Sequence, residues 1–404
     1  MKKTFLKFLA GVTAVTTIAF AFAGCGGGSA IEVPSFGDEY INIGLSGPLT
    51  EGAAIYGIAA QNSAKLAVKE INDNGGLSNG IKFAFEMLDD KAKGDISTTT
   101  YASLKDKGMQ ITLGTVTTGA FLGIKQDLIK DEIFTITPSA TGDDVTKGAT
   151  NIYQMCFSDS NQGTVAAEFV NENVEAGKKI GILYRSSDPY SKGIYDKFKA
   201  SIDTTKFPDI TEAPFTDENP TDLSGQVALL KNCEFIFMPI YYTPASVFMS
   251  QANTTISATA VYFGCDGLDG IDNIEGFDIK GIRQEVSMLS HFNSKATEGE
   301  AKTFCDKFLQ YYDASELNQF GASTYDCIYA IKDILNTAIA NGKTVTASLT
   351  AKEFTAIIKE VLDAGYEYKN GVTGSGASIT WKSGADNGQA VKHAVKYIVK
   401  AKNA

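Results

Sequence analysis

Side chains that commonly carry out catalysis or bind metal are scarce in this sequence of 404 residues. The only histidines are His291 and His393, and each stands in a sequence typical of a strand, where an imidazole usually has a structural role. Five cysteines follow Cys25, without any CxxC pair: Cys156, Cys233, Cys265, Cys305 and Cys327. This distribution argues against a histidine-dependent triad, a multi-histidine metal site, a zinc ribbon and a disulfide scaffold. We therefore expect no metal ion and no cofactor, and we expect most of the later cysteines to be small buried apolar residues.

Three stretches rich in glycine or acid lack residues that the corresponding ligand-binding motifs need. The stretch "GVTGSGAS" at 371 to 378 has no Gly-Lys-Ser/Thr ending for a phosphate loop. The stretch "DDKAKGD" at 89 to 95 has lysine where a calcium loop needs oxygen ligands. The stretch "GCDGLDG" at 264 to 270 lacks the GxGxxG spacing of a dinucleotide site. Nucleotide, calcium and dinucleotide binding are therefore weakly supported.

Hydrogen-bonding side chains gather instead at six predicted strand ends. Ser, Thr, Tyr or Asp, mostly with glycine, occurs in "SGPLT" from Ser46, "TVTTG" from Thr115, "PSATGDD" from Pro138, "YRSSDPY" from Tyr184, "YYTP" from Tyr241 and "GCDG" from Gly264. Each of these residue types is also common in ordinary turns and helix caps. Ligands of open parallel sheets bind beyond the carboxyl ends of the strands. The coincidence at six strand ends therefore predicts a cleft for a small polar group.

The elements that would position these loops alternate between strand and helix. The apolar runs "YINIGLSG", "IKFAFEML", "MQITLG" and "IFTITP" read as strands. After the first run, Ala60, Ala64, Ala67, Val68 and Ile71 have the spacing of one helix face. Two further helical segments are expected around 96 to 107 and 120 to 132. This alternation predicts an α/β fold with a parallel sheet covered by helices on both faces.

The same order of elements begins again near residue 161, which predicts two similar lobes. Helices near 161 to 176, 190 to 204 and 221 to 231 alternate with the strands "KIGILY", "ITEAPF", "EFIFMPI" and "AVYFG". The strand "IRQEVSMLSHF" is followed by helices near 298 to 312, 322 to 340 and 351 to 364, and by a terminal strand in "HAVKYIVKA". Because these elements follow two complete halves, we expect the chain to return to the first lobe and then to the second.

The first 24 residues have the pattern of a secretory signal peptide. Three lysines precede a mostly apolar run from 8 to 22, and no acid occurs in this region. The run is short for a transmembrane helix, which needs about 20 residues. Small residues before Cys25 resemble a bacterial lipobox, so we expect residues 1–24 to be removed, Cys25 to be lipidated and residues 25–39 to form a flexible tether. The alternatives are an ordinary signal peptide with an incidental cysteine and an uncleaved anchor.

The acidic composition limits the partners of the protein. The formal net charge is −11, and removal of residues 1–24, which carry three lysines and no acid, makes it −14. Binding to nucleic acid or to anionic lipid needs clustered Lys and Arg. We therefore expect no nucleic-acid partner. About 380 residues would remain, which is enough for two domains.

An ordered set of motifs between Tyr40 and Tyr329 resembles the leucine/isoleucine/valine-binding type of ABC-transporter solute-binding proteins. The motifs are "IGLSGPLT", "AVKEINDNGG", "ITPSATGDDVT", "YQMCFSDSNQG", "DPYSKG" and "FGCDG". The C-terminal part is looser, and "ITWKSGADNG" is only faintly similar to the last crossing of the family. The resemblance implies the type I periplasmic binding fold, in which two doubly wound parallel-sheet lobes are joined by a three-segment hinge with the ligand cleft between them.

The resemblance also places the hinge and the lobes in this chain. It puts the three crossings near 157 to 160, 285 to 290 and 370 to 376. Residues 40–158 with 288–372 would form lobe 1, and residues 159–287 with 373–404 would form lobe 2. Lobes of this kind close on the ligand by hinge motion.

Nine residues match ligand-binding positions of the family, and these are Tyr56, Thr117, Thr118, Ser139, Ala140, Thr141, Tyr190, Tyr242 and Asp266. The two threonines after the third strand would hold the α-carboxylate of an amino acid, and the N-terminus of the helix that begins near Gly119 would favour this anion. The carbonyl and hydroxyl groups of residues 139 to 141 would hold the ammonium together with Asp266 of the other lobe. The tyrosines would line or close the cleft.

The function implied by the resemblance is capture of an amino acid outside the cell, with a branched-chain, other aliphatic or aromatic side chain. The protein would perform no chemistry and would act with the permease of an ABC importer. It would be anchored by lipid on the extracellular face of the membrane, as in Gram-positive bacteria. Three features depart from the best-known branched-chain binders: the acid is Asp266 and not a longer glutamate, the first loop is extended by "EGAA", and no cysteine lies near Thr117 to form a disulfide. The first two leave the ligand side chain open.

Two other classes of function remain to be distinguished. The same fold serves receptors and amide-responsive regulators, so the protein could be a ligand-sensing lipoprotein for amides or other small polar solutes, acting with a separate membrane partner. An extracellular enzyme is disfavoured by the scarcity of histidine, although carboxylates alone can carry out hydrolysis. Turnover of a candidate substrate would reveal an enzyme, whereas a binder would show only saturable binding.

Overall fold

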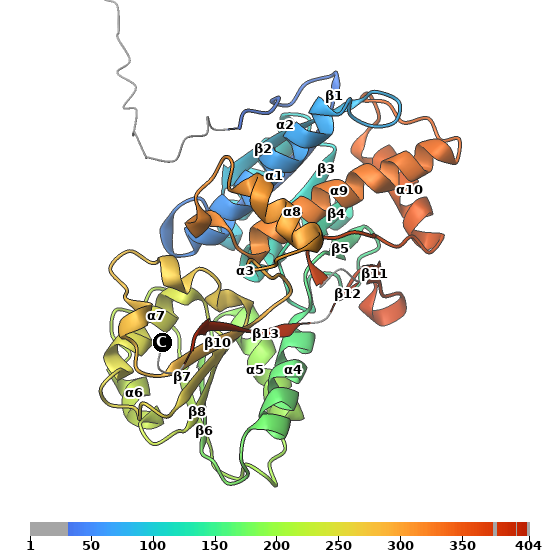
Figure 1. Cartoon of the computed structure of the whole chain (residues 1–404). Coiled ribbons are helices and arrows are strands. Elements are labelled where there is room, and N and C mark those ends of the chain that lie inside the picture. Colours follow the sequence, from blue (N-terminus) through green and yellow to red (C-terminus); the bar gives the residue numbers. More distant parts are fainter. Residues whose placement is uncertain (1–30, 375–377, 393, 402–404) are drawn as a thin grey trace, which may run out of the picture.

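The computed structural model describes residues 31–374, 378–392 and 394–401, and these form two lobes (Figure 1). Each lobe is built around one sheet whose strands are mainly parallel, with helices packed on it. The predicted α/β class with two doubly wound lobes is therefore confirmed. Cys25, His393 and the predicted signal peptide lie outside the described residues. Within the described ranges, no helix combines the length and the apolar character needed to cross a membrane.

The first lobe contains a five-stranded parallel sheet with the strand order β2-β1-β3-β4-β5. The strands are β1 (Tyr40–Gly47), β2 (Lys82–Asp89), β3 (Ile111–Thr115), β4 (Thr135–Thr137) and β5 (Ile152–Gln154). The helices are α1 (Ala54–Asp73), α2 (Gly94–Asp106), α3 (Thr118–Lys130), α8 (Gly299–Phe308), α9 (Gln319–Ala340) and α10 (Ala351–Asp363). Helix α1 packs against α9, so the late helices complete the first lobe, as the sequence predicts.

The second lobe contains a six-stranded sheet with the order β13-β10-β9-β8-β6-β7. Its strands are β6 (Ile180–Arg185), β7 (Ile210–Phe215), β8 (Phe235–Met238), β9 (Val261–Gly264), β10 (Glu285–Ser290) and β13 (Val395–Lys400). Its helices are α4 (Asp159–Asn173), α5 (Pro189–Ser201), α6 (Ser224–Leu230) and α7 (Tyr242–Ala252). The terminal strand β13 lies antiparallel beside β10, drawn in dark red in Figure 1, so the chain returns to this lobe at its end.

The sequence pattern does not predict three of the short strands. Strand β5 has three residues and overlaps the start of the stretch "YQMCFSDSNQG", where no apolar alternation marks it. Strands β11 (Thr380–Trp381) and β12 (Ala390–Val391) have two residues each and form a small separate sheet. Periodicity cannot be recognised in two or three residues, because a strand pattern needs at least four. Strand β4 also has three residues, but it lies within the longer run "IFTITP".

The structure places two of the hinge segments differently from the prediction. Strand β10 pairs with β9 and β13 along its length, so the chain leaves the second lobe after Ser290, and the predicted boundary between 287 and 288 falls inside this strand. Residues 380–390 lie against β5 of the first lobe, because Trp381 Nε1 donates to the carbonyl of Gln154 at 2.7 Å. The last crossing therefore lies between Val391 and Val395 and not at 370 to 376, and the predicted start of the second part of lobe 2 at 373 is too early.

A buried lysine holds the last crossing to the first lobe. Lys392 is almost fully buried, and its Nζ donates to Thr373 Oγ1 at 2.5 Å. Asp326 of α9 accepts hydrogen bonds from the backbone N–H groups of Val372 and Thr373 at 2.8 and 3.0 Å. Burial lowers the pKa of Lys392 to about 8, although the charge of Asp326 acts in the opposite direction. Thr373, Lys392 and Asp326 thus form one polar cluster, which fixes the chain on both sides of residues 375–377.

The cysteines and the described histidine occupy structural positions. The five cysteines after Cys25 are all buried, and none of them is in a disulfide. The ring of His291 lies edge-on to Phe157 at 4.8 Å between ring centroids, and burial lowers its pKa well below the usual range. These residues therefore contribute to packing, as the sequence predicts.

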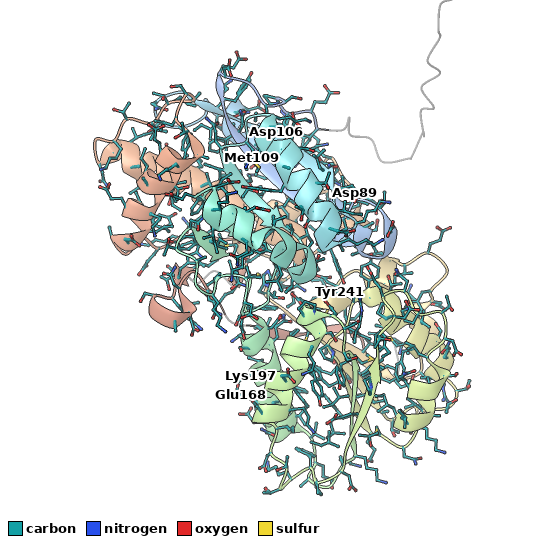
Figure 2. All side chains as sticks on the ribbon, turned by 180° about the vertical axis from the view of Figure 1, so that it is seen from behind. Asp89, Asp106, Met109, Glu168, Lys197 and Tyr241 are labelled. Carbon is teal, nitrogen blue, oxygen red and sulfur yellow. The ribbon has the colours of Figure 1, made fainter. Side chains whose placement is uncertain are left out.

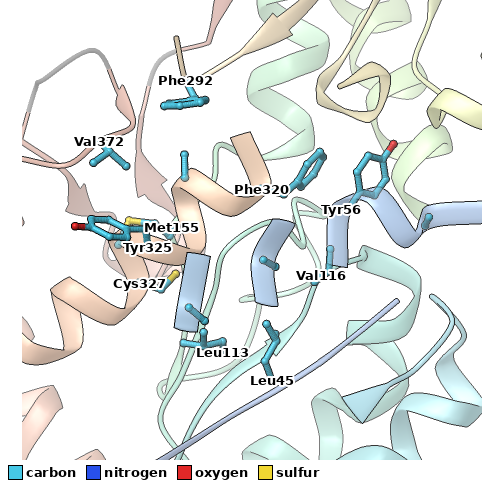
Figure 3. Close-up of a cluster of buried hydrophobic side chains, with 14 of the residues drawn as sticks. Leu45, Tyr56, Leu113, Val116, Met155, Phe292, Phe320, Tyr325, Cys327 and Val372 are labelled. Carbon is cyan, nitrogen blue, oxygen red and sulfur yellow. The ribbon is translucent and has the colours of Figure 1, made fainter. Parts of the chain in front are cut away.

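The core of the first lobe reaches the junction of the lobes. Figure 3 shows Tyr56 of α1 and Phe320 of α9 side by side, with Leu45, Leu113 and Val116 of the first lobe beneath them in this view. The ring centroids of Tyr56 and Phe320 are 4.2 Å apart. The aromatic residues that face the second lobe are thus held by the same apolar cluster that packs β1 and β3.

One glycine permits the close approach of α1 to the loop after β1. A Cβ atom at Gly57 would lie 1.8 Å from the carbonyl oxygen of Pro48. We expect Gly57→Ala to lower the free energy of unfolding by about 1 to 3 kcal/mol, because backbone must move to relieve the contact. Urea unfolding followed by circular dichroism measures this change.

The matched control is Gly225→Ala in α6, where a Cβ atom would meet no atom within 4 Å. Alanine is a better helix former than glycine, so this control should be neutral or stabilising by up to about 1 kcal/mol. Equal unfolding midpoints for the two variants would contradict the proposed close contact at Gly57.

Candidate functional site

The loops that follow the strands meet where the two lobes face each other. In the first lobe, the Ser46 hydroxyl donates to Asp90 Oδ2 at 3.0 Å and lies 2.6 Å from Thr100 Oγ1. Asp90 is fully buried, and burial raises its pKa to about 6. These contacts hold the end of β1 to the loop after β2 and to the middle of α2. Ser46 therefore serves the framework of the cleft.

The two threonines after β3 have different surroundings. Thr117 is 4% exposed, and its Oγ1 has no hydrogen-bond partner among the described residues. The Oγ1 of Thr118 accepts a hydrogen bond from the backbone N–H of Gly142 at 3.0 Å, which connects the loops after β3 and β4. Helix α3 begins at Thr118, so the backbone N–H groups of its first turn lie beside the hydroxyl of Thr117. Thr117 is the better placed of the two to bind a ligand.

Residues 139 to 141 are tied to their neighbours by backbone and side-chain contacts. The Ser139 hydroxyl donates to the carbonyl of Val116 at 2.7 Å. The carbonyl of Ala140 accepts from Gln154 Nε2 at 2.7 Å. Thr141 Oγ1 is buried without a hydrogen-bond partner in the described part of the chain. These contacts fix the shape of the loop and leave the hydroxyl of Thr141 free to bind a ligand.

Asp266 is enclosed by the second lobe. It is 2% exposed and follows β9, where its Oδ1 accepts from the Tyr190 hydroxyl at 2.7 Å. Its backbone N–H donates to Gln162 Oε1 at 3.0 Å. Burial raises the pKa of Asp266 to about 6, and the hydrogen bond from Tyr190 acts in the opposite direction. The carboxylate is therefore oriented by Tyr190 and partly deprived of water.

Tyrosines from both lobes join across the cleft. The Tyr56 hydroxyl of the first lobe donates to the carbonyl of Gly267 in the second lobe at 2.5 Å. The ring of Tyr56 lies edge-on to those of Tyr241 and Tyr242, at 5.8 and 5.0 Å between centroids. Tyr241 stacks on Tyr190 at 4.8 Å, and Figure 2 shows Tyr241 at the level where the lobes meet. The predicted positions Tyr56, Tyr190 and Tyr242 therefore belong to one aromatic cluster.

Further hydrogen bonds join the lobes beside this cluster. Thr243 Oγ1 donates to the carbonyl of Gly52 at 2.8 Å, and the backbone N–H of Gln319 donates to Asp269 Oδ2 at 2.9 Å. Gly52 belongs to the extended loop "EGAA", and Gln319 is the first residue of α9. The structure thus holds the lobes in direct contact at this edge.

Asp159 is a functional candidate that the sequence reasoning missed. It is the first residue of α4 and is 2% exposed, and neither of its carboxylate oxygens has a hydrogen-bond partner among the described residues. Its backbone N–H donates to the carbonyl of Thr141 at 2.9 Å, which places it between the lobes. Burial raises its pKa well above the usual range, the nearby side chain of Thr141 acts in the opposite direction, and the negative charge of Asp266 raises the pKa further. Its position in the quoted motif "YQMCFSDSNQG" was the only signal in the sequence.

A second missed group is Tyr241 with the cavity that it borders. A cavity of about 370 Å³ lies between the lobes, and its wall includes Thr117 and Gly119 of the first lobe and Asp188 and Tyr241 of the second. The sequence has two adjacent tyrosines here, and only Tyr241 lines the cavity. Which of two neighbours faces a cleft depends on the exact end of β8 and the start of α7, which the sequence does not define.

The structure therefore brings most of the nine predicted residues to one region. Two residues of α4 link them. The backbone N–H of Asp159 donates to the carbonyl of Thr141, and Gln162 Oε1 accepts from the backbone N–H of Asp266. The hydroxyls of Thr118 and Ser139 and the backbone of Ala140 bond within the first lobe. Thr117, of the nine, lines the cavity. The assignment of all nine to ligand binding stays a prediction.

Known proteins share both the sequence pattern and the fold. The family model described as "Periplasmic binding protein" matches residues 40–403. A "Leu/Ile/Val-binding protein homolog 3" from Brucella melitensis is 28% identical over 302 residues, which cover 74% of this chain and 76% of that protein.

Two solved structures have a similar fold. The branched-chain amino acid transporter substrate-binding protein LivJ from Streptococcus pneumoniae, in complex with isoleucine, has a TM-score of 0.72 and 23% identity, covering 89% of this chain and 100% of that one. An ABC-transporter solute-binding protein from R. palustris, in complex with benzoate, has a TM-score of 0.73 and 18% identity, covering 90% and 94%. The family match over nearly the whole described chain confirms the resemblance seen in the motifs. This chain belongs to the family of periplasmic binding proteins.

Proposed function

We propose that this protein captures an amino acid outside the cell in the cleft between its lobes and delivers it to an ABC importer, with Cys25 carrying a lipid anchor. Cys25 lies outside the described residues, so the anchor rests on the sequence pattern. The name of the Brucella relative and the isoleucine complex of the S. pneumoniae structure support an amino acid as the ligand. The benzoate complex has the same fold, so the fold alone does not select the ligand.

The proposal rests on a group of buried polar atoms between the lobes that have no hydrogen-bond partner among the described residues. These atoms are Thr117 Oγ1, Thr141 Oγ1, Gln162 Nε2 and both carboxylate oxygens of Asp159. Buried polar atoms in proteins nearly always have a hydrogen-bond partner. A small molecule with an anionic and a cationic end would supply partners for both the donors and the acceptors in this group.

The two ends of an amino acid match the two sides of this site. Thr117 and the N-terminus of α3 offer hydrogen-bond donors, which suit the α-carboxylate. Asp266 and Asp159 are buried acids, and none of the salt bridges within the described chain involves either one. A buried charge without a partner is strongly disfavoured. An ammonium group near these acids would favour their ionised forms.

Closure of the lobes would complete the site. The cleft is bordered by residues of both lobes, and the hydrogen bond from Tyr56 to Gly267 joins them directly. An amino acid that contacts both lobes favours the closed state, because it gains its full set of contacts only there. We therefore propose that the crossings after Gln154, after Ser290 and after Val391 act as the hinge.

The amino-acid proposal predicts a large effect at Asp266. A thermal-shift panel of the proteinogenic amino acids would first identify the tightest ligand, since a ligand at 100 times its Kd stabilises a protein by about 2.7 kcal/mol. We expect Asp266→Ala to weaken binding of this ligand about 30- to 5000-fold in calorimetric titration, because the bound ammonium loses its counter-charge. The variant must also retain a cooperative unfolding transition.

Asp272→Ala is the matched control, because Asp272 is an exposed acid six residues further along the chain. Asp269 is unsuitable, since it bonds to α9 across the lobes. A folded Asp266→Ala protein that loses less than about threefold in affinity would show that Asp266 does not pair with a ligand ammonium, and it would favour a neutral ligand such as an amide.

The closure proposal predicts an effect at Tyr56. Tyr56→Phe removes the hydroxyl that bonds to Gly267 and keeps the ring, so we expect the affinity for the ligand to fall about 2- to 12-fold. Small-angle scattering should show a smaller ligand-induced decrease in the radius of gyration at subsaturating ligand. Tyr262→Phe is the control, because its hydroxyl has no hydrogen-bond partner in the described ranges. Identical affinity and scattering in both variants would contradict a role of Tyr56 in closure.

The anchor proposal predicts a change in location on mutation of Cys25. We expect Cys25→Ser to release the protein into the medium or to leave an unprocessed precursor, because a serine cannot form the thioether that carries the lipid. Intact mass measurement and detergent partitioning of cell fractions test this expectation. A membrane-bound protein whose mass is unchanged apart from the substituted atom would disprove lipidation at this residue.

A further inference from the structure

The wall of the cavity between the lobes differs in composition from the wall expected for a pocket that binds an aliphatic side chain. Seventeen residues line it, and five of them are charged, namely Lys93, Asp95, Arg185, Asp188 and Glu218. The apolar contribution comes from alanine, proline and the ring of Tyr241. No leucine, isoleucine, valine, methionine or phenylalanine stands among the described residues of this wall. A branched aliphatic side chain placed here would meet about as much polar as apolar surface.

Arg185 and Asp188 give this wall both a hydrogen-bond donor and an acceptor. Arg185 ends β6, and its side chain is 19% exposed, with Nη2 at 3.8 Å from Glu218 Oε2 and Nε donating to Ser187 Oγ at 3.1 Å. Asp188 precedes α5 and is 7% exposed. No lysine or arginine nitrogen of the described chain lies within 4 Å of its carboxylate. Both side chains therefore keep hydrogen-bonding capacity that a ligand could use.

The titration state of Asp188 follows from its surroundings. Burial raises its pKa to about 6, and the charge of Arg185 acts in the opposite direction. Glu218 raises the pKa slightly, while the backbone N–H groups of Tyr190 and Ser191 lower it. At neutral pH the carboxylate is therefore mostly ionised and accepts hydrogen bonds.

The opposite wall is built by the loop that is extended in this chain. Gly52 and Ala53 of "EGAA" line the cavity, and Glu51 holds the loop through ion pairs with Lys91 and Lys93 at 3.0 and 2.8 Å. Glu51, Lys91 and Ala92 all have positive φ angles, of 64°, 54° and 60°. Such backbone conformations are costly for these residue types and are concentrated at functional sites. The loop is thus held in a specific shape over the cavity.

We propose that this cavity receives the side chain of the bound amino acid, and that this side chain ends in a group that both donates and accepts hydrogen bonds, of which a carboxamide is the simplest. The inference rests on the proposed function, because it assumes an amino acid whose α-carboxylate lies at Thr117 in the same wall. The carboxamide N–H group would donate to Asp188, and its carbonyl would accept from Arg185.

The alternatives to a carboxamide each leave a group without a partner. An aliphatic side chain would remove water from Arg185 and Asp188 without replacing its hydrogen bonds, which is unfavourable for buried polar groups. A carboxylate would pair with Arg185 and repel Asp188. An ammonium group would pair with Asp188 and repel Arg185. A site built to hydrogen-bond a polar group rejects analogues that lack this group.

Calorimetric titration of the purified protein with glutamine, asparagine, glutamate, lysine, methionine and leucine tests this inference. We expect glutamine or asparagine to bind at least about tenfold more tightly than each of the other four, which corresponds to one or two hydrogen bonds. In Asp188→Asn and Arg185→Met, the preference for this amide over leucine should fall at least about fivefold. Asp209→Asn, which changes an exposed acid of the same lobe, should keep the wild-type preference.

The outcomes separate this inference from the proposed function. If leucine or methionine binds most tightly, the polar side-chain site is wrong and amino-acid capture stands. The same holds if glutamate or lysine binds most tightly, because a single charge then determines selection. If Asp188→Asn and Arg185→Met weaken the amide and leucine equally, these residues support the fold and do not select the ligand. If no amino acid in the full proteinogenic panel binds, the proposed function itself fails.

Discussion

Two buried carboxylates, Asp159 and Asp266, stand where the lobes meet, and the cost of burying their charge shapes the structure around them. Asp266 is oriented by Tyr190, whose hydroxyl donates to it, and Asp159 keeps two unpartnered oxygens among the described residues. Burial raises the pKa of both acids, so each is more stable in its ionised form when a cation is close. A positively charged group at the junction of the lobes would therefore stabilise the ionised form of these acids.

The loops around these acids are held by contacts that do not depend on a ligand. Ser46 bonds to Asp90, Thr118 accepts from Gly142, and the carbonyl of Ala140 accepts from Gln154. Such contacts fix the backbone while the side chains of Thr117 and Thr141 remain without partners in the described chain. A site with a fixed framework and free polar groups loses little conformational entropy when a ligand binds. These contacts give Thr118 and Ala140, two residues of the family pattern, hydrogen bonds within the first lobe.

The fold and the choice of ligand are separate properties. Structures with TM-scores of 0.72 and 0.73 to this chain are complexes with isoleucine and with benzoate. The two sheets and their helices place a cleft between the lobes, and the side chains at the strand ends give it its chemistry. In this chain those side chains include Arg185 and Asp188 on one wall and the extended loop of Gly52 and Ala53 on the other. The extended loop is one of the parts in which this chain departs from the branched-chain binders that it resembles.

The sequence by itself determined the alternation of strand and helix, the doubling into two lobes and the polar loops at the strand ends. These features depend on local periodicity and composition, which short segments already contain. Strands β1 and β7 have the predicted limits, whereas β5, β11 and β12 are too short to show a pattern. Only the tertiary structure decided that residues 380–390 lie against the first lobe, that Tyr241 and not Tyr242 lines the cavity, and that Asp159 is buried without a partner among the described residues. Each of these features depends on which segments, far apart in the chain, come into contact and on which side chains lose contact with water when they pack. The local sequence pattern contains neither kind of information.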